Sequence, residues 1–319
     1  MTSTAQNSAV VRLDPAKFQN PDVTLDGQRR ASVELKQFHT LWFNTGTLCN
    51  LTCTNCYIES SPSNDRLAYL SLDDVATMLD ELDQDWQAQE IGFTGGEPFM
   101  NPEFIAMLEN ALARGYRALV LTNAMRPMMK QADALLALKE RFGDKLAVRV
   151  SIDHYTEQLH NLERGKHAWS RMLPGLKWLA ANGFNLDVAG RTQWAEPEGK
   201  LRAGYARMFA EHGIGIDARN PQHLVLFPEM DETVDVPEIT TACWGILDVS
   251  PDAMMCASSR MVVKRKGESK VGIVACTLLP YDDEFEMGGT LAEAAKPVKL
   301  NHPHCARFCV LGGGACSVG

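Results

Sequence analysis

Short apolar runs alternate with segments whose apolar residues recur every three or four positions, from about residue 38 to residue 230. The short runs predict strands at 39–46, 90–96, 117–123, 146–153, 184–192 and 223–228. The periodic segments predict helices at 71–82, 101–115, 127–143, 167–183 and 197–213. Strands that alternate with helices in this way predict a parallel sheet with right-handed crossovers.

The ends of two predicted helices carry recognisable signals. Ser71 and Asp74 have the spacing of a capping box, and Asn101 is predicted to cap the next helix, with Pro102 in its first turn and Gly115 at its stop. The strands are fewer than the eight of a closed barrel, so an open, partial (β/α)₆ barrel and a flat doubly wound sheet both fit. In either architecture, the chemistry belongs at the carboxyl ends of the strands.

The pattern changes at both ends of the chain. Residues 1–37 are polar and weakly periodic, which indicates an N-terminal extension to a core at 38–235. From residue 236 the alternation stops, and 261–279 is predicted to be a β-hairpin that turns near Gly267. We expect 236–319 to form a separate, small, cysteine-rich domain.

Charge and hydropathy argue against a nucleic-acid-binding, secreted or membrane-spanning protein. The net charge of −9 argues against a nucleic-acid partner, because nucleic-acid binders are more often basic. The N-terminus lacks a signal-peptide pattern, and no apolar run approaches the roughly 18–20 residues of a membrane span. We therefore expect a cytoplasmic protein without a membrane partner, in which cysteines stay reduced and serve as metal ligands or catalytic groups.

The nine cysteines fall into two groups. Cys49, Cys53 and Cys56 lie within one short loop, and residues 57–242 contain none. The others follow in the last quarter of the chain: Cys243, Cys256, Cys276, Cys305, Cys309 and Cys316. This distribution predicts two sites.

The first group has an unusual number of thiolates. A closed zinc site needs four ligands, so zinc would require a distant fourth residue. A [4Fe–4S] cluster held by three thiolates leaves one iron open to a substrate or cofactor. A [4Fe–4S] cluster therefore explains why this loop has three cysteines and not four.

The motif Cys49-x₃-Cys53-x₂-Cys56 resembles the signature of the radical SAM superfamily. The segment "TGGEP" after the second strand resembles that family's glycine-rich motif, and the likeness covers roughly 38–230. It implies the partial barrel. It also implies an S-adenosylmethionine (SAM) molecule bound at the open iron and cleaved by one electron to a 5′-deoxyadenosyl radical, which removes hydrogen from the substrate. The family usually has an aromatic residue where this chain has Asn55.

The resemblance also implies roles for residues at the strand ends. The turn from Gly95 through Gly96 to Pro98, with Glu97, would hold the SAM amino group. The remaining assignments are Ser151 and Asp153 for the ribose hydroxyls, Arg191 for the carboxylate, Asn123 as a further candidate and Tyr57 for packing against adenine. Two simpler interpretations stay open: Ser151 and Asp153 could cap the next helix, and Arg191 could be an ion-paired residue of the rim.

The second cysteine group resembles a SPASM/Twitch-type extension, which carries auxiliary iron–sulfur clusters. We expect one auxiliary [4Fe–4S] cluster on Cys256, Cys276, Cys305 and Cys309, with Cys316 and Cys243 in reserve. His304 is a less favoured ligand, and structural zinc is the alternative metal.

These features together predict a radical SAM enzyme of the oxidoreductase or maturase type. Its substrate would be a peptide or protein side chain or a small molecule, and its electron donor a reductase, ferredoxin or flavodoxin. The N-terminal segment is too short for a separate peptide-recognition domain, which mildly disfavours a leader-dependent peptide. The alternatives are a cyclase resembling the molybdopterin-precursor enzyme and a non-catalytic metal-binding or electron-transfer protein.

Overall fold

A parallel sheet forms the core of the protein, for which a computed structural model describes residues 11–228 and 231–314. Its strands are β2 (Thr40–Asn44), β3 (Glu90–Thr94), β4 (Arg117–Thr122), β5 (Leu146–Ser151), β6 (Asn185–Arg191) and β7 (Leu224–Phe227). They pair in chain order, every pair parallel. All five residues of β2 are buried, as expected for a sheet that is covered on both faces. The predicted strands and their parallel arrangement are confirmed.

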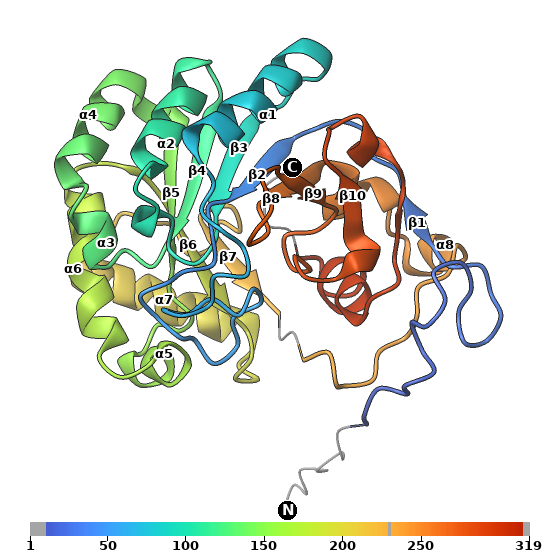
Figure 1. The fold of residues 1–319 in the computed structure, drawn as a ribbon. Helices are drawn as coiled ribbons and strands as arrows, with labels where there is room; N and C mark the ends of the chain where they lie inside the picture. The colour runs from blue at the N-terminus through green and yellow to red at the C-terminus, as the bar shows by residue number, and fades with distance from the viewer. Residues whose placement is uncertain (1–10, 229–230, 315–319) are drawn as a thin grey trace, which may run out of the picture.

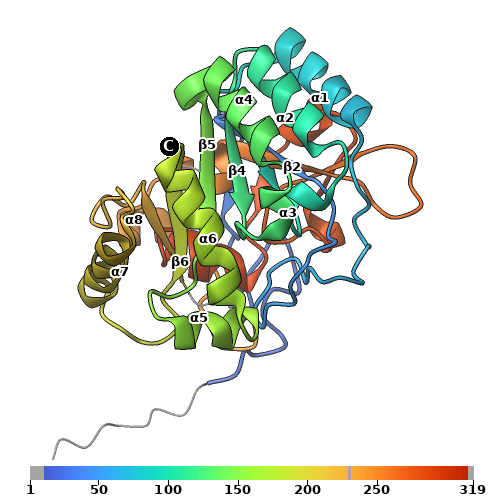
Figure 2. The ribbon, with the colours of Figure 1, turned by 90° about the vertical axis from the view of Figure 1, so that its left-hand side faces the viewer.

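Helices join the strands, and several of them cover one face of the sheet. They are α1 (Leu72–Asp85), α2 (Phe104–Ala113), α3 (Arg126–Met129), α4 (Ala132–Phe142), α5 (Glu157–Arg164), α6 (Ala168–Ala181), α7 (Glu198–His212) and, in the C-terminal region, α8 (Cys243–Leu247). Figure 1 shows α1, α2, α4 and α6 on one side of the sheet and the C-terminal region on the other, and Figure 2 brings these helices to the front. The fold is the α/β architecture that the sequence predicts. No helix in the described part of the chain combines the length and the apolarity needed to cross a bilayer.

Two of the predicted helices, those at 101–115 and 127–143, differ from the prediction in where they begin or in their continuity. Ser71 forms the predicted capping box with Asp74, but Asn101 does not cap α2, which begins at Phe104 after a 3₁₀ turn at Pro98–Met100. Asn101 instead donates side-chain hydrogen bonds to the carbonyls of Thr45 (3.0 Å) and Leu70 (2.8 Å). The helix predicted at 127–143 is divided into α3 and α4.

The sequence does not predict α5. Its buried residues are His160 and Glu163, so no apolar stripe marks the helix. His160 and Glu163 are buried because other parts of the fold pack against them. A search for apolar periodicity does not detect such contacts.

The predicted hairpin joins the core sheet. β8 (Ser259–Val263) pairs in parallel with β2, and β9 (Gly272–Val274) and β10 (Glu286–Gly288) follow as antiparallel strands. The sheet thus has nine strands in the order β10-β9-β8-β2-β3-β4-β5-β6-β7. The separate unit expected at 236–319 therefore shares its sheet with the core, and the domain limits remain a prediction.

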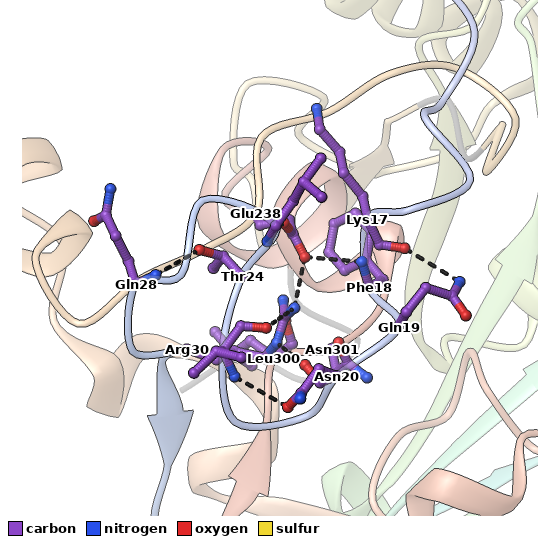
Figure 3. A network of polar contacts seen from close by, with 12 residues as sticks. Lys17, Phe18, Gln19, Asn20, Thr24, Gln28, Arg30, Glu238, Leu300 and Asn301 are labelled. Atoms are coloured by element: carbon purple, nitrogen blue, oxygen red, sulfur yellow. Dashed lines mark hydrogen bonds and ion pairs between the residues drawn. The ribbon is translucent and has the colours of Figure 1, made fainter.

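The N-terminal extension wraps onto the C-terminal region. β1 (Ser32–Val33) pairs with β11 (Val298–Lys299). Arg30 is buried, and its Nη2 lies 2.5 Å from a carboxylate oxygen of Glu238 (Figure 3). Glu238 also accepts hydrogen bonds from the backbone N–H groups of Phe18 and Leu25. One buried ion pair thus joins the extension to the segment around residue 238.

Replacing Arg30 by methionine should destabilise the protein. The change leaves the Glu238 carboxylate buried without its cation, which costs about 3–5 kcal/mol in comparable cases. Urea unfolding followed by circular dichroism measures the loss. Arg29→Met is the matched control, because Arg29 is exposed. Equal unfolding free energies for the two variants would contradict the role given to the ion pair.

Candidate functional site

The three-cysteine loop lies at the carboxyl ends of the parallel strands. Cys49, Cys53 and Cys56 follow β2 and line one cavity. The same cavity is lined by most of the other residues predicted for the site: Tyr57, Gly95, Gly96, Asn123, Ser151, Asp153 and Arg191. These residues come from the last residues of five different strands or from the loops that follow them, as expected when parallel strands end at one edge.

The glycine turn after β3 packs directly on the cysteine loop. The N–H of Gly96 donates to the carbonyl of Gly46 at 2.7 Å. A Cβ on Gly96 would collide with the carbonyl of Leu48, and one on Gly95, whose φ is +142°, would lie 2.6 Å from the carbonyl oxygen of Gly46. Only glycine allows this approach of the two backbones, so the turn fixes the start of the cysteine loop.

Glu97 and Pro98 do not line the cavity. The Glu97 carboxylate is buried and accepts hydrogen bonds from the Thr122 hydroxyl (2.8 Å) and the Asn123 N–H (2.9 Å), while Pro98 begins the 3₁₀ turn. Asn123 in turn donates to the side chain of Asn50 in the cysteine loop at 2.9 Å. Glu97 therefore joins the ends of β3 and β4, and its contact with an amino group stays a prediction.

Asp153 is part of a buried ion pair that the sequence does not predict. Arg164 of α5 donates to both of its carboxylate oxygens, at 2.5 and 3.1 Å, and Nε of Arg191 lies 3.5 Å away. Burial opposes ionisation, but the two arginines hold the pKa of Asp153 below its usual value. Asp153 does not cap α5, whose N-cap residue is Thr156.

Arg191 lies between the cysteine loop and Asp153. Its guanidinium lies 4.6 Å from the centroid of the Tyr57 ring, and Nη2 donates to the carbonyl of Asn55 at 2.5 Å. Nη1 is buried and has no hydrogen-bond partner in the described parts of the chain. A buried guanidinium N–H that faces a cavity needs an acceptor, and a carboxylate matches its geometry.

Asn55 of the cysteine loop is held in place by Glu163. The Glu163 carboxylate accepts from the Asn55 N–H at 2.8 Å and from its side-chain amide at 3.0 Å. The Glu163 carbonyl accepts from the N–H of Thr54 at 2.9 Å. Glu163 and Arg164 are the site residues that sequence reasoning missed, because both lie on the unpredicted helix α5.

The chemistry of the donor set fits an iron–sulfur cluster. Burial raises the pKa of Cys49 to about 12 and also raises the pKa of Cys53. Thiols in this state are protonated in the absence of metal and lose their protons on binding iron. Among the described residues, no three histidine, cysteine or acidic side chains converge closely enough to hold a single metal ion. The thiolates of a cube bind different corners and so need wider spacing.

The second cysteine group also meets around one cavity. Cys256, Cys276, Cys305 and Cys309 line it together with His304 and apolar side chains. Burial raises the pKa of Cys256 to about 11. Cys243 does not line this cavity, and its Sγ accepts from the N–H of Thr240 at 3.3 Å. Cys316 lies outside the described residues.

Comparison with known proteins finds a family that matches a large part of the core. Residues 43–191 match the family model of the radical SAM superfamily. They include the cysteine loop, the glycine turn and the strand ends described above. This part of the chain, a little under half of it, is similar to the radical SAM superfamily.

Two curated relatives are similar to the chain over less than half of its length. The chain is 32% identical over 143 residues to the antilisterial bacteriocin subtilosin biosynthesis protein AlbA of Bacillus subtilis, a match that covers 44% of this chain and 30% of AlbA. It is 30% identical over 136 residues to the mycofactocin maturase MftC of Mycobacterium ulcerans, covering 43% and 35% of the two chains. The match spans about a third of each relative's length.

A solved structure shows that the fold likeness extends beyond this domain. SuiB of Streptococcus suis, bound to its precursor peptide SuiA, superposes with a TM-score of 0.58 at 11% identity, over 80% of this chain and 63% of SuiB. At this identity the likeness shows the fold alone, and it supports the α/β architecture of the core.

The buried Glu97 should make stability depend on pH. Burial raises its pKa from 4.5 to about 7, so between these values the folded protein holds a proton that the unfolded chain has released. The free energy of unfolding should therefore fall as the pH rises through this window, by up to ~3 kcal/mol. Urea unfolding of metal-free protein at pH values across the window measures this slope.

Glu97→Gln should flatten this pH dependence, because the amide keeps an acceptor oxygen and does not titrate. Glu140→Gln, at an exposed position on α4, is the control and should leave the slope unchanged. A Glu97→Gln variant with the wild-type slope would show that Glu97 is ionised throughout the window.

Proposed function

We propose that this chain is a radical SAM enzyme whose Cys49, Cys53 and Cys56 hold a [4Fe–4S] cluster with SAM beside it. The observation that carries the proposal is the meeting of three thiols and the glycine turn in one cavity, within a region that matches the family. When bound, the cluster and SAM supply the reductive cleavage that gives a 5′-deoxyadenosyl radical.

The residues of the cavity have distinct parts in this proposal. The three thiols bind iron, and the Gly95–Gly96 turn lets the backbone approach the amino end of SAM. Arg191 offers its free Nη1 to the SAM carboxylate. Ser151 and Asp153 face the ribose, and Arg164 fixes the orientation of Asp153.

The cavity wall restricts what reaches the radical. Trp42, Leu121, Phe227 and Leu278 line the cavity beside the polar groups. An apolar wall excludes water and protects a reactive intermediate from side reactions. Tyr57, which is stacked with Arg191, is the residue we assign to adenine.

A second cluster is proposed on Cys256, Cys276, Cys305 and Cys309, which line one cavity. This region is proposed to be of the SPASM/Twitch type. His304 lines the same cavity but is not one of the four proposed ligands, and structural zinc remains the alternative metal there.

We assign a peptide or protein side chain as the substrate ahead of a small molecule. Subtilosin and mycofactocin appear in the names of the two curated relatives, and SuiB is seen with a precursor peptide. The cluster would be reduced by a reductase, ferredoxin or flavodoxin in the cytoplasm.

Anaerobically reconstituted protein should convert SAM to 5′-deoxyadenosine in the presence of dithionite. Cys53→Ala should abolish the product, because one cluster ligand is lost. Chromatography of the quenched reaction measures it. Cys243→Ala is the matched control and should keep wild-type turnover, since Cys243 lines neither cysteine cavity. Absence of product, or equal turnover of wild type and Cys53→Ala, contradicts the proposal.

Metal analysis tests the second cluster separately. Wild type should contain roughly eight iron atoms per chain, and Cys256→Ala with Cys305→Ala roughly four. The absorbance and electron paramagnetic resonance of the remaining cluster should persist in the double variant. Roughly four irons in wild type, with one zinc, would assign the second site to structural zinc.

A further inference from the structure

A groove opens beside the cluster cavity, between the cysteine loop and the C-terminal region. Its charged rim consists of Glu59, Asp231, Glu232 and Asp282. None of the described residues that line it is a lysine or an arginine. We call this feature the acidic groove.

The acidic groove is continuous with the site of the proposed chemistry. Cys56 and Tyr57 line both the groove and the cluster cavity. Leu278 lines both of these and also the cavity of the second cysteine group. A molecule in the groove therefore contacts the wall of the cluster cavity.

Local contacts hold part of the rim in place, and one of its four carboxylates, that of Glu59, is paired with a cation. One carboxylate oxygen of Asp231 accepts from the N–H of Thr233 at 2.9 Å, and one of Asp282 accepts from the N–H of Glu284 at 3.0 Å. These contacts orient the carboxylates and bring no cation. Glu59 is 3.2 Å from Arg66, a residue outside the groove lining.

A buried polar side chain in the groove lacks a partner. His304 is 8% exposed and lies between the groove and the cavity of the second cysteine group, lining both, and its Nδ1 has no hydrogen-bond partner in the described residues. A buried ring nitrogen without a partner costs free energy that a bound polar group would offset. A peptide backbone offers both a donor and an acceptor, so it suits either tautomer of the ring.

We propose that the acidic groove binds a substrate peptide segment that carries lysine or arginine side chains close to the residue presented to the cluster cavity. The carboxylates of the rim attract the cationic side chains, and His304 pairs with a backbone group. The inference rests on the proposed function and names the substrate class of that site.

Binding of fluorescent octapeptides to the reconstituted holoprotein tests the inference. The probes share a glycine–serine frame and carry two lysines, two glutamines or two glutamates. Fluorescence anisotropy should show the lysine peptide binding about tenfold more tightly than the glutamine peptide at low salt. The preference should shrink at high salt, because rim charges are screened.

Removing the charges of the rim shows whether the lysine peptide binds to the acidic groove or is attracted by the net negative charge of the whole protein. The triple variant Asp231→Asn, Glu232→Gln, Asp282→Asn keeps an acceptor oxygen at each position and should lose the lysine preference. The control triple Asp26→Asn, Glu140→Gln, Glu211→Gln removes the same charge from exposed positions outside the groove and should keep it. Equal affinity for the three peptides, or equal loss in both triples, overturns the inference.

Cross-linking shows where the peptide binds. Together with the assay for 5′-deoxyadenosine, it distinguishes a failure of the groove inference from a failure of the proposed enzyme function. A benzophenone-labelled lysine peptide should cross-link to residues around Tyr57, Leu279 or Tyr281, which line the groove. Cross-links only elsewhere on the surface overturn the inference. Production of 5′-deoxyadenosine without a lysine preference would reject the groove as a cationic site and leave the proposed function standing.

Discussion

The site depends on the hydrogen bonds that join helix α5 to the cysteine loop. The loop contains no regular strand or helix, and within it only an isolated bridge joins Leu48 to Ser61. Its conformation is therefore set by contacts from outside. Glu163 contacts Thr54 through its backbone carbonyl and Asn55 through its carboxylate, and a hydrogen bond to a charged group such as this carboxylate contributes about 1.5–3 kcal/mol. The adjacent Arg164 orients Asp153 from the same helix end.

The parts of the fold and site that the sequence predicts are those encoded over short distances. Strand and helix periodicity located the core sheet, and the spacing of Cys49, Cys53 and Cys56 predicted the loop that lines the cavity. Glu163 and Arg164 were missed because their partners are distant in sequence and their helix lacks an apolar face. The orientation of Glu97 toward β4, away from the cavity, likewise depends on the neighbouring strand end and not on the motif that contains it.

The C-terminal region and the core form one structure around the chemistry. The segment from Cys276 to Leu279 carries a predicted cluster ligand, and its residues Thr277 and Leu278 line the cluster cavity of the core. One short stretch thus separates the two cysteine cavities. The parallel pairing of β8 with β2 fixes its position, since β9 ends at Val274, shortly before it. A substitution in this segment would alter the lining of both cysteine cavities.

The same pairing has a consequence for biosynthesis. β2 acquires its neighbour β8 only after the long segment between Asn44 and Ser259 has been made, so the apolar strand Thr40–Asn44 emerges from the ribosome with one edge open. At about 5–20 residues per second, that edge stays unprotected for tens of seconds. An exposed apolar strand edge is a template for aggregation. This edge of β2 is therefore protected within the protein only once β8 has been made and has paired with it.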